Sequence, residues 1–146
     1  SVKGKPMSED LKLSEIDLVA KDGSPVHLAY EEIGDILEIV FPNVQPDCSL
    51  ELTDNILLSF NRMQRTASGL TILDFSALAT PSEFGPRTFA LSGLDPLPTE
   101  LMETVIYILA HPPVNQFLKI LSFQPTAGKV IPLTYVDRSQ AMAVAA

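Results

Sequence analysis

The chain has 146 residues, 46% of them hydrophobic and 19% charged, which is the size and balance of one globular domain and excludes a disordered chain. Its 10 basic and 18 acidic side chains give a formal net charge of -8, which argues against nucleic-acid binding through a broad basic face and favours a basic protein partner. Cys48 is the only cysteine, so neither an intrachain disulfide nor a cysteine-based zinc site can form, and a cytoplasmic location is expected.

The beginning of the chain contributes little to the expected fold. Residues 1–6 form a basic stretch that is interpreted as a cloning remnant before a native start at Met7, so a single domain is expected over residues 7–146. Residues 11–19 alternate weakly and are predicted to form a short strand or helix. No apolar run approaches the ~18 residues that a membrane span requires, and there is no secretory signal, so no membrane association is expected.

Residues 26–78 have the pattern of an antiparallel β-meander of about five strands. Apolar positions alternate over residues 26–30, which is typical of a strand with one buried face. Gly34 is expected to supply the positive φ of a tight turn, and residues 36–41 then form the second strand of a hairpin.

The meander is expected to continue with a second hairpin over residues 50–60 and a fifth strand over residues 70–73, introduced by Gly69. Apolar residues such as Leu57 and Leu73 fall on the second face of this sheet. A large apolar surface is rarely left in water, so a further element is expected to cover that face.

The pattern changes to helical spacing over residues 98–124, after a connector rich in proline and glycine over residues 79–97. Pro112 and Pro113 must end a first helix, because proline lacks the amide that a helix interior needs. A second helix is predicted after them from apolar residues at i, i+3, i+4 and i+7. The apolar positions of the two helices are Leu101, Val105, Ile108 and Leu109, then Val114, Phe117, Leu118 and Leu121.

The last predicted element is a strand over residues 130–136. Pro132 cannot donate to a strand ladder, so this segment is expected at the edge of a sheet. The predicted fold class is therefore α+β, with an antiparallel β-meander of about five strands packed against a C-terminal helical hairpin.

Three stretches, YEEIGDILEIVF, ELTDNILLSF and GLTILDFS, lie within residues 28–78. They resemble a small bacterial β-meander domain family of unknown function, whose members have Tyr-Asp-x-x-x-Asp-x-Leu-Tyr-Ile, an acidic hairpin and Gly-(Ile/Leu)-Glu-Ile-Leu-Asp-Ala-Ser. This chain differs from that pattern by Glu38 in place of an aromatic residue. The resemblance implies a compact β-domain. It also implies a binding role, since some members belong to gene pairs of the toxin and antitoxin kind.

The sequence contains no motif of an established catalytic or metal site. It has no glycine-rich phosphate loop, no G-x-S-x-G and no H-E-x-x-H, so no catalytic residue, metal ligand or cofactor is predicted. His27 is expected on the polar face of its strand, and His111 at a helix C-terminus, where a cation interacts favourably with the helix dipole. Cys48 lies beside an acidic residue, which disfavours a reactive thiolate, so it is interpreted as structural.

Two classes of function stay open. The first is a non-catalytic interaction or regulatory protein that acts through protein–protein contacts and forms a homo-oligomer by strand-edge pairing. The alternative is a small-molecule binder or enzyme with a pocket between sheet and helices, in which His27, Tyr30 and Tyr107 would bind the ligand.

Overall fold

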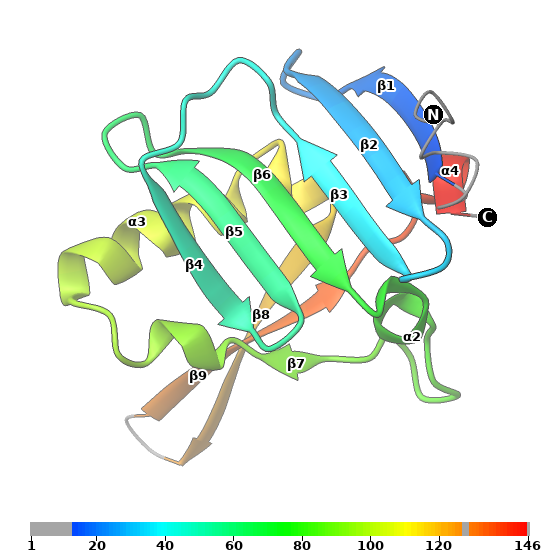
Figure 1. The fold of residues 1–146 in the computed structure, drawn as a ribbon. Helices are drawn as coiled ribbons and strands as arrows, with labels where there is room; N and C mark the ends of the chain where they lie inside the picture. Colours follow the sequence, from blue (N-terminus) through cyan, green and yellow to red (C-terminus); the bar gives the residue numbers. More distant parts are fainter. Residues whose placement is uncertain (1–12, 127–128, 146) are drawn as a thin grey trace.

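The computed structural model describes residues 13–126 and 129–145, which form an α+β fold (Figure 1). Six antiparallel strands make one large sheet with the spatial order β1-β2-β3-β6-β5-β4. These strands are β1 (Leu13–Val19), β2 (Pro25–Glu31), β3 (Ile36–Val40), β4 (Cys48–Thr53), β5 (Ile56–Asn61) and β6 (Thr66–Leu73). The predicted β-meander is confirmed as two three-stranded meanders, joined where β3 pairs with β6.

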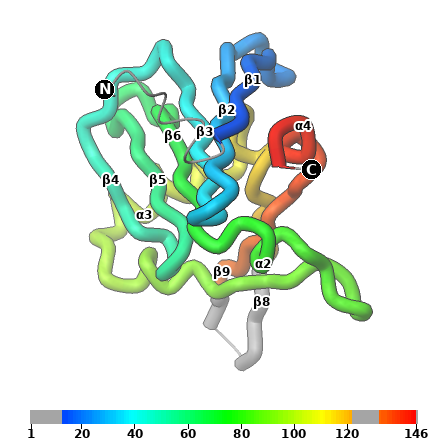
Figure 2. Tube along the Cα trace, turned by 45° about the vertical axis from the view of Figure 1, so that its right-hand side comes forward, coloured from blue at the N-terminus to red at the C-terminus, as the bar shows by residue number. Residues whose placement is uncertain are grey.

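A second layer lies behind the large sheet in Figure 1 and covers one of its faces. It contains the helix α3 and a three-stranded sheet in the order β7-β9-β8. The elements after β6 are α2 (Phe75–Ala79), β7 (Phe89–Ala90), η1 (Ser92–Leu94), α3 (Thr99–Ala110), η2 (Val114–Gln116), β8 (Leu118–Thr126), β9 (Lys129–Val136) and α4 (Met142–Ala145). Figure 2 shows α4 beside β1 and β2, which it contacts.

The core lies between the large sheet and the second layer. Alternate residues of the sheet point into it because successive side chains of a strand face opposite sides. Fully burying one such Leu or Phe side chain stabilises the fold by about 1.5–3 kcal/mol. The deeply buried side chains of the two layers include Leu28, Leu37, Ile39, Leu58, Phe60, Leu70 and Ile72 from the sheet, and Val105, Leu109, Val114 and Phe117 from the second layer.

The second face of the large sheet differs from expectation. Within residues 13–126 and 129–145, no helix or strand lies over it (Figure 1). Val40, Leu57 and Leu73 on this face are 37–41% exposed. The apolar residues that suggested a cover are therefore part of the molecular surface.

The predicted C-terminal helical hairpin is wrong in its second half. The first helix is confirmed as α3, but residues 118–126 form strand β8, which pairs with β9. The apolar run around Leu118 and Ile120 fits both a helix stripe and a strand, and periodicity cannot separate the two in so short a segment. Pairing with β9 makes this segment a strand, and Leu121 is 43% exposed in it.

The predicted strand over residues 130–136 is confirmed as β9, but it lies at the centre of its sheet and not at the edge. The backbone amide of Leu91 donates to the carbonyl of Pro132 at 3.0 Å, so Pro132 turns its hydrogen-bonding side toward β7. In an antiparallel strand the nitrogen and oxygen of one residue point to the same neighbour. The missing amide of Pro132 therefore faces the end of the two-residue β7 and leaves the ladder with β8 unaffected.

The turn of the first hairpin has a different conformation from the predicted one. Asp35, and not Gly34, has the left-handed conformation, with φ 57°. The Glu31 carboxylate accepts hydrogen bonds from the amides of Ile33 at 2.7 Å and Gly34 at 2.8 Å. Aspartate tolerates positive φ better than most residues, and the carboxylate of Glu31 satisfies the turn amides, so this turn needs no glycine in the left-handed region.

Gly93 gives a test of how η1 packs on the large sheet. A Cβ atom at this position would overlap the carbonyl oxygen of Glu51, which belongs to the backbone of β4. We expect Gly93→Ala to lower the free energy of unfolding by about 1–3 kcal/mol, because the backbones must separate. Ser92→Ala in the same short helix is the control. Urea denaturation that shows equal stability for the two variants would contradict this packing.

Candidate functional site

We call the uncovered face of the large sheet the open face. The strand register places its residues in three rows that run across the strands. The first row is Asp17, His27, Val40, Gly69, Ser59 and Ser49; the second is Glu15, Ala29, Glu38, Thr71, Leu57 and Glu51; the third is Leu13, Glu31, Ile36 and Leu73.

The charged side chains of the open face, apart from His27, are all acidic. Its three rows contain five carboxylates and no lysine or arginine. The carboxylates belong to Glu15, Asp17, Glu31, Glu38 and Glu51. Glu38 lies in the middle row between Ala29 and Thr71, so negative charge is present at the centre of the face as well as toward its edges.

Two hollows lie on the open face and share Thr71. The first, which we call the Gly69 hollow, has a volume of about 340 Å³ and extends under the loop of residues 41–47. The second, the Leu73 hollow, has a volume of about 180 Å³ and reaches the turn between β4 and β5. The residues that line the Gly69 hollow include Glu38, Val40, Pro42, Val44, Pro46, Ser59 and Gly69. A ligand that lies along β6 would contact both hollows.

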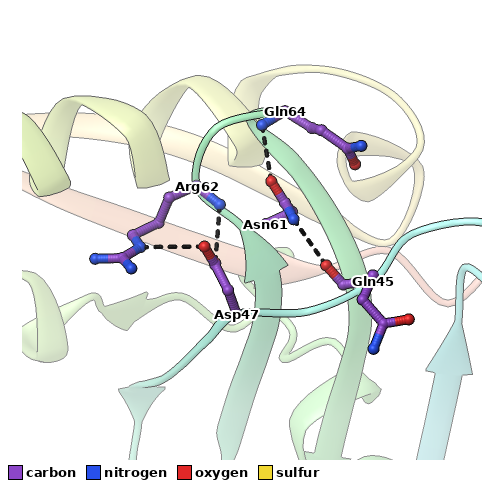
Figure 3. Close-up of polar contacts among 5 residues, drawn as sticks. All are labelled: Gln45, Asp47, Asn61, Arg62 and Gln64. Carbon is purple, nitrogen blue, oxygen red and sulfur yellow. Dashed lines mark hydrogen bonds and ion pairs between the residues drawn. The ribbon is translucent and has the colours of Figure 1, made fainter.

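A network of polar contacts holds the loop beside the Gly69 hollow (Figure 3). The side chain of Asn61 donates to the carbonyl of Gln45 at 2.9 Å, and its own oxygen accepts from the amide of Gln64 at 2.9 Å. The Asp47 carboxylate accepts from the backbone amide of Arg62 at 3.0 Å and from its Nε at 3.4 Å. The sequence analysis does not identify this network, because its residues come together only when β4 and β5 pair.

His27 lies on the open face, as the alternation of its strand predicts. Its Nδ1 lies 2.7 Å from Asp17 Oδ1 and its Nε2 lies 2.8 Å from Glu15 Oε1. The hydrogen bonds with Asp17 and then Glu15 raise the pKa of His27 above its ordinary value of 6.5. A protonated imidazole donates to both carboxylates, so His27 ties edge strand β1 to β2.

Tyr30 belongs to a structural cluster on the covered side of the sheet. Its hydroxyl donates to Asp35 Oδ1 at 2.6 Å, and its ring meets the edge of Phe75 at a centroid distance of 5.9 Å. Burial, together with the hydrogen bond to Asp35, raises the pKa of Tyr30 to about 12. Burial also acts to raise the pKa of Asp35, but hydrogen bonds from Ser76 and Tyr30 outweigh it and the net shift is downward. This cluster joins α2 to the first hairpin.

Tyr107 lies in different surroundings, on α3. Its ring is stacked on His111 at 3.9 Å, and the guanidinium of Arg65 lies 3.9 Å from its centre. The structure therefore does not bring His27, Tyr30 and Tyr107 together. The interior between sheet and helix is filled by buried apolar side chains, and a hollow of about 230 Å³ at its margin is lined by Tyr107 but by neither His27 nor Tyr30.

The described residues contain no group of three or more His, Cys, Asp or Glu side chains placed to hold a metal ion. None of the helices within the described ranges is both long and apolar enough to cross a membrane.

Comparisons with protein-family models, with curated proteins and with solved structures found no match for this chain. The resemblance of residues 28–78 to a small bacterial β-meander family stays a prediction.

The contacts of His27 predict how stability depends on pH. Because the folded state raises its pKa, the stabilisation is fully present below the ordinary pKa of 6.5 and is lost as the pH rises through the folded value. We expect the difference in unfolding free energy between wild type and His27→Gln to shrink as the pH rises from 6.5 through the raised pKa of folded His27. NMR titration of the imidazole, with His111→Gln to assign the two signals, gives the folded pKa. A midpoint at or below 6.5 would contradict the contact with Asp17 and Glu15.

Proposed function

We propose that this protein is a non-catalytic interaction protein that binds a basic segment of a partner protein on its open face. The observation that carries the proposal is the charge of this face, which has five carboxylates and no lysine or arginine in its three rows. A regulatory role through such a contact, and a cytoplasmic location, belong to the same proposal.

Charge complementarity determines the kind of partner. The chain has a net charge of -8, and the open face concentrates carboxylates on one side of it. Such a surface attracts cations over a range of about 8–10 Å at physiological salt and speeds the encounter with a basic partner. It repels a phosphate backbone, so nucleic acid is not part of the proposal.

The composition of the open face also supports a protein ligand. Val40, Leu57 and Leu73 expose 37–41% of their surface between the carboxylates, an arrangement of apolar contacts within a polar rim. Adjacent strands lie about 4.8 Å apart, so the six strands of the open face span roughly 24 Å from first to last. A face of this width is small for an interface between two whole domains. This size favours a short segment of the partner over a whole domain.

The alternative of a small-molecule binder or enzyme has less support. It requires a pocket between the two layers that contains its ligand-binding residues, and the hollow of about 230 Å³ between β6 and α3 contains only Tyr107 of them. Its three proposed ligand-binding residues, His27, Tyr30 and Tyr107, contact different neighbours.

Self-association by strand-edge pairing stays a prediction. η1 packs against the backbone of β4 at Glu51, so of the two edges of the large sheet β1 is the one that a homodimer would use. Light scattering on the full chain gives the molar mass that tests this.

Binding to a basic peptide tests the proposed function. We expect a fluorescein-labelled lysine-rich peptide to bind with a salt-sensitive Kd, and a glutamate-rich peptide of the same length not to bind. Replacing Glu15, Glu38 and Glu51 together by Gln should weaken binding about tenfold or more, because it removes charge from the open face.

The matched control removes the same charge elsewhere. Glu83, Glu100 and Glu103 are exposed and lie outside the open face, so their joint replacement by Gln should leave most of the affinity. Fluorescence anisotropy measures both variants. An equal loss of affinity in the two triple variants would show that binding depends on the net charge of the chain, and it would contradict a site on the open face.

A further inference from the structure

We infer that the Gly69 hollow is the binding site of a single lysine side chain of the partner, an inference that rests on the proposed function. The hollow lies where β3, β6 and β5 are adjacent, and its volume is about 340 Å³. It is therefore an open hollow in the surface of the open face, next to the charge of Glu38.

The floor of the hollow is bare because Gly69 has no side chain. Gly69 lies in the first row between Val40 and Ser59. A Cβ atom added to Gly69 would lie 3.1 Å from the carbonyl oxygen of Ile39, which is tighter than ordinary contact. The close pairing of β3 with β6 thus favours glycine here, and this absence of a side chain leaves space for one from a ligand.

One end of the hollow is polar. The Glu38 carboxylate accepts a hydrogen bond from the hydroxyl of Thr71 at 3.3 Å, and the two residues face each other across β3 and β6. The hydroxyl of Ser59, which lies 3.2 Å from that of Ser49, also lines the hollow. These oxygens are acceptors, and an ammonium group has three donors and no acceptor.

The other end is apolar. The loop that follows β3 places Pro42, Val44 and Pro46 at the hollow, next to Val40. Such side chains suit the methylene stem of a long cationic side chain, which buries its stem while its charged end reaches a polar group. The contacts of Asp47 and Asn61 hold this loop in place (Figure 3), so little conformational entropy is lost on binding.

The acceptors favour lysine over arginine. A guanidinium binds best to a carboxylate that offers both oxygens in one plane. Glu38 is the one carboxylate that lines the hollow, and its Oε2 already accepts from Thr71. A compact ammonium that contacts one carboxylate oxygen of Glu38 and the neighbouring hydroxyl of Thr71 matches this arrangement better.

Amide chemical shifts of the full chain, labelled with ¹⁵N, test the inference. We expect Nα-acetyl-lysine amide to shift the signals of Gly69, Thr71 and Ser59 most. Nα,Nε-diacetyl-lysine amide keeps the stem but has no charge, so it should bind about tenfold more weakly. Glu38→Gln should produce a similar loss. Glu83→Gln removes one exposed carboxylate outside the open face and is the matched control, and it should bind the probe within about twofold of wild type.

Two results would overturn the inference. Equal loss of affinity in Glu38→Gln and Glu83→Gln, with amide shifts spread over the surface, would reject the hollow, while binding of the lysine-rich peptide would still support the proposed function. Higher affinity for the probe in a full-length Lys3→Gln, Lys5→Gln variant would assign the hollow to the chain's own first residues. Failure of the lysine-rich peptide to bind would instead reject the proposed function itself.

Discussion

The pairing of β3 with β6 joins the two meanders, and both faces of the molecule depend on it. On the covered face, this pairing aligns Leu37 with Ile72 and Ile39 with Leu70, and all four are almost completely buried. On the open face it opposes Val40 to Gly69. The core and the Gly69 hollow thus lie on opposite faces of the same strand pair. A side chain at position 69 would come close to the backbone of β3 at Ile39, a residue whose side chain belongs to the core.

Local sequence was sufficient for much of the fold. Period-two alternation and turn residues predicted β2 to β6, because each of these strands buries one face and ends at a polar turn. Helical spacing of apolar residues gave the wrong element for residues 118–126, where the partner strand β9 decides the structure. The preference of glycine for positive φ assigned the left-handed residue of the first turn to Gly34, although Asp35 adopts that conformation. Contacts with residues distant in sequence explain the first failure, and the Glu31 carboxylate in the turn explains the second.

The candidate site was much harder to predict. Glu38 and Glu51 are two of eighteen acidic residues, and nothing in their local sequence marks them. They share a face only through a register that crosses β3, β6, β5 and β4. The order of these strands is not sequential, since β3 pairs with β6 and not with β4. A simple sequential meander would have separated Gly69 from Val40, and the hollow between them would not exist.

The carboxylates of the open face are not equivalent, and their neighbours determine which of them can attract a ligand. Glu15 and Asp17 contact His27, whose protonated form offsets part of their charge. Glu31 accepts two amides of its own turn. Among the described residues, Glu38 contacts only the neutral hydroxyl of Thr71, and Glu51 has no polar side-chain contact. Since a charge that is already paired attracts a ligand less, the negative potential of the face should be strongest from Glu38 across β6 to Glu51, along the line of the two hollows.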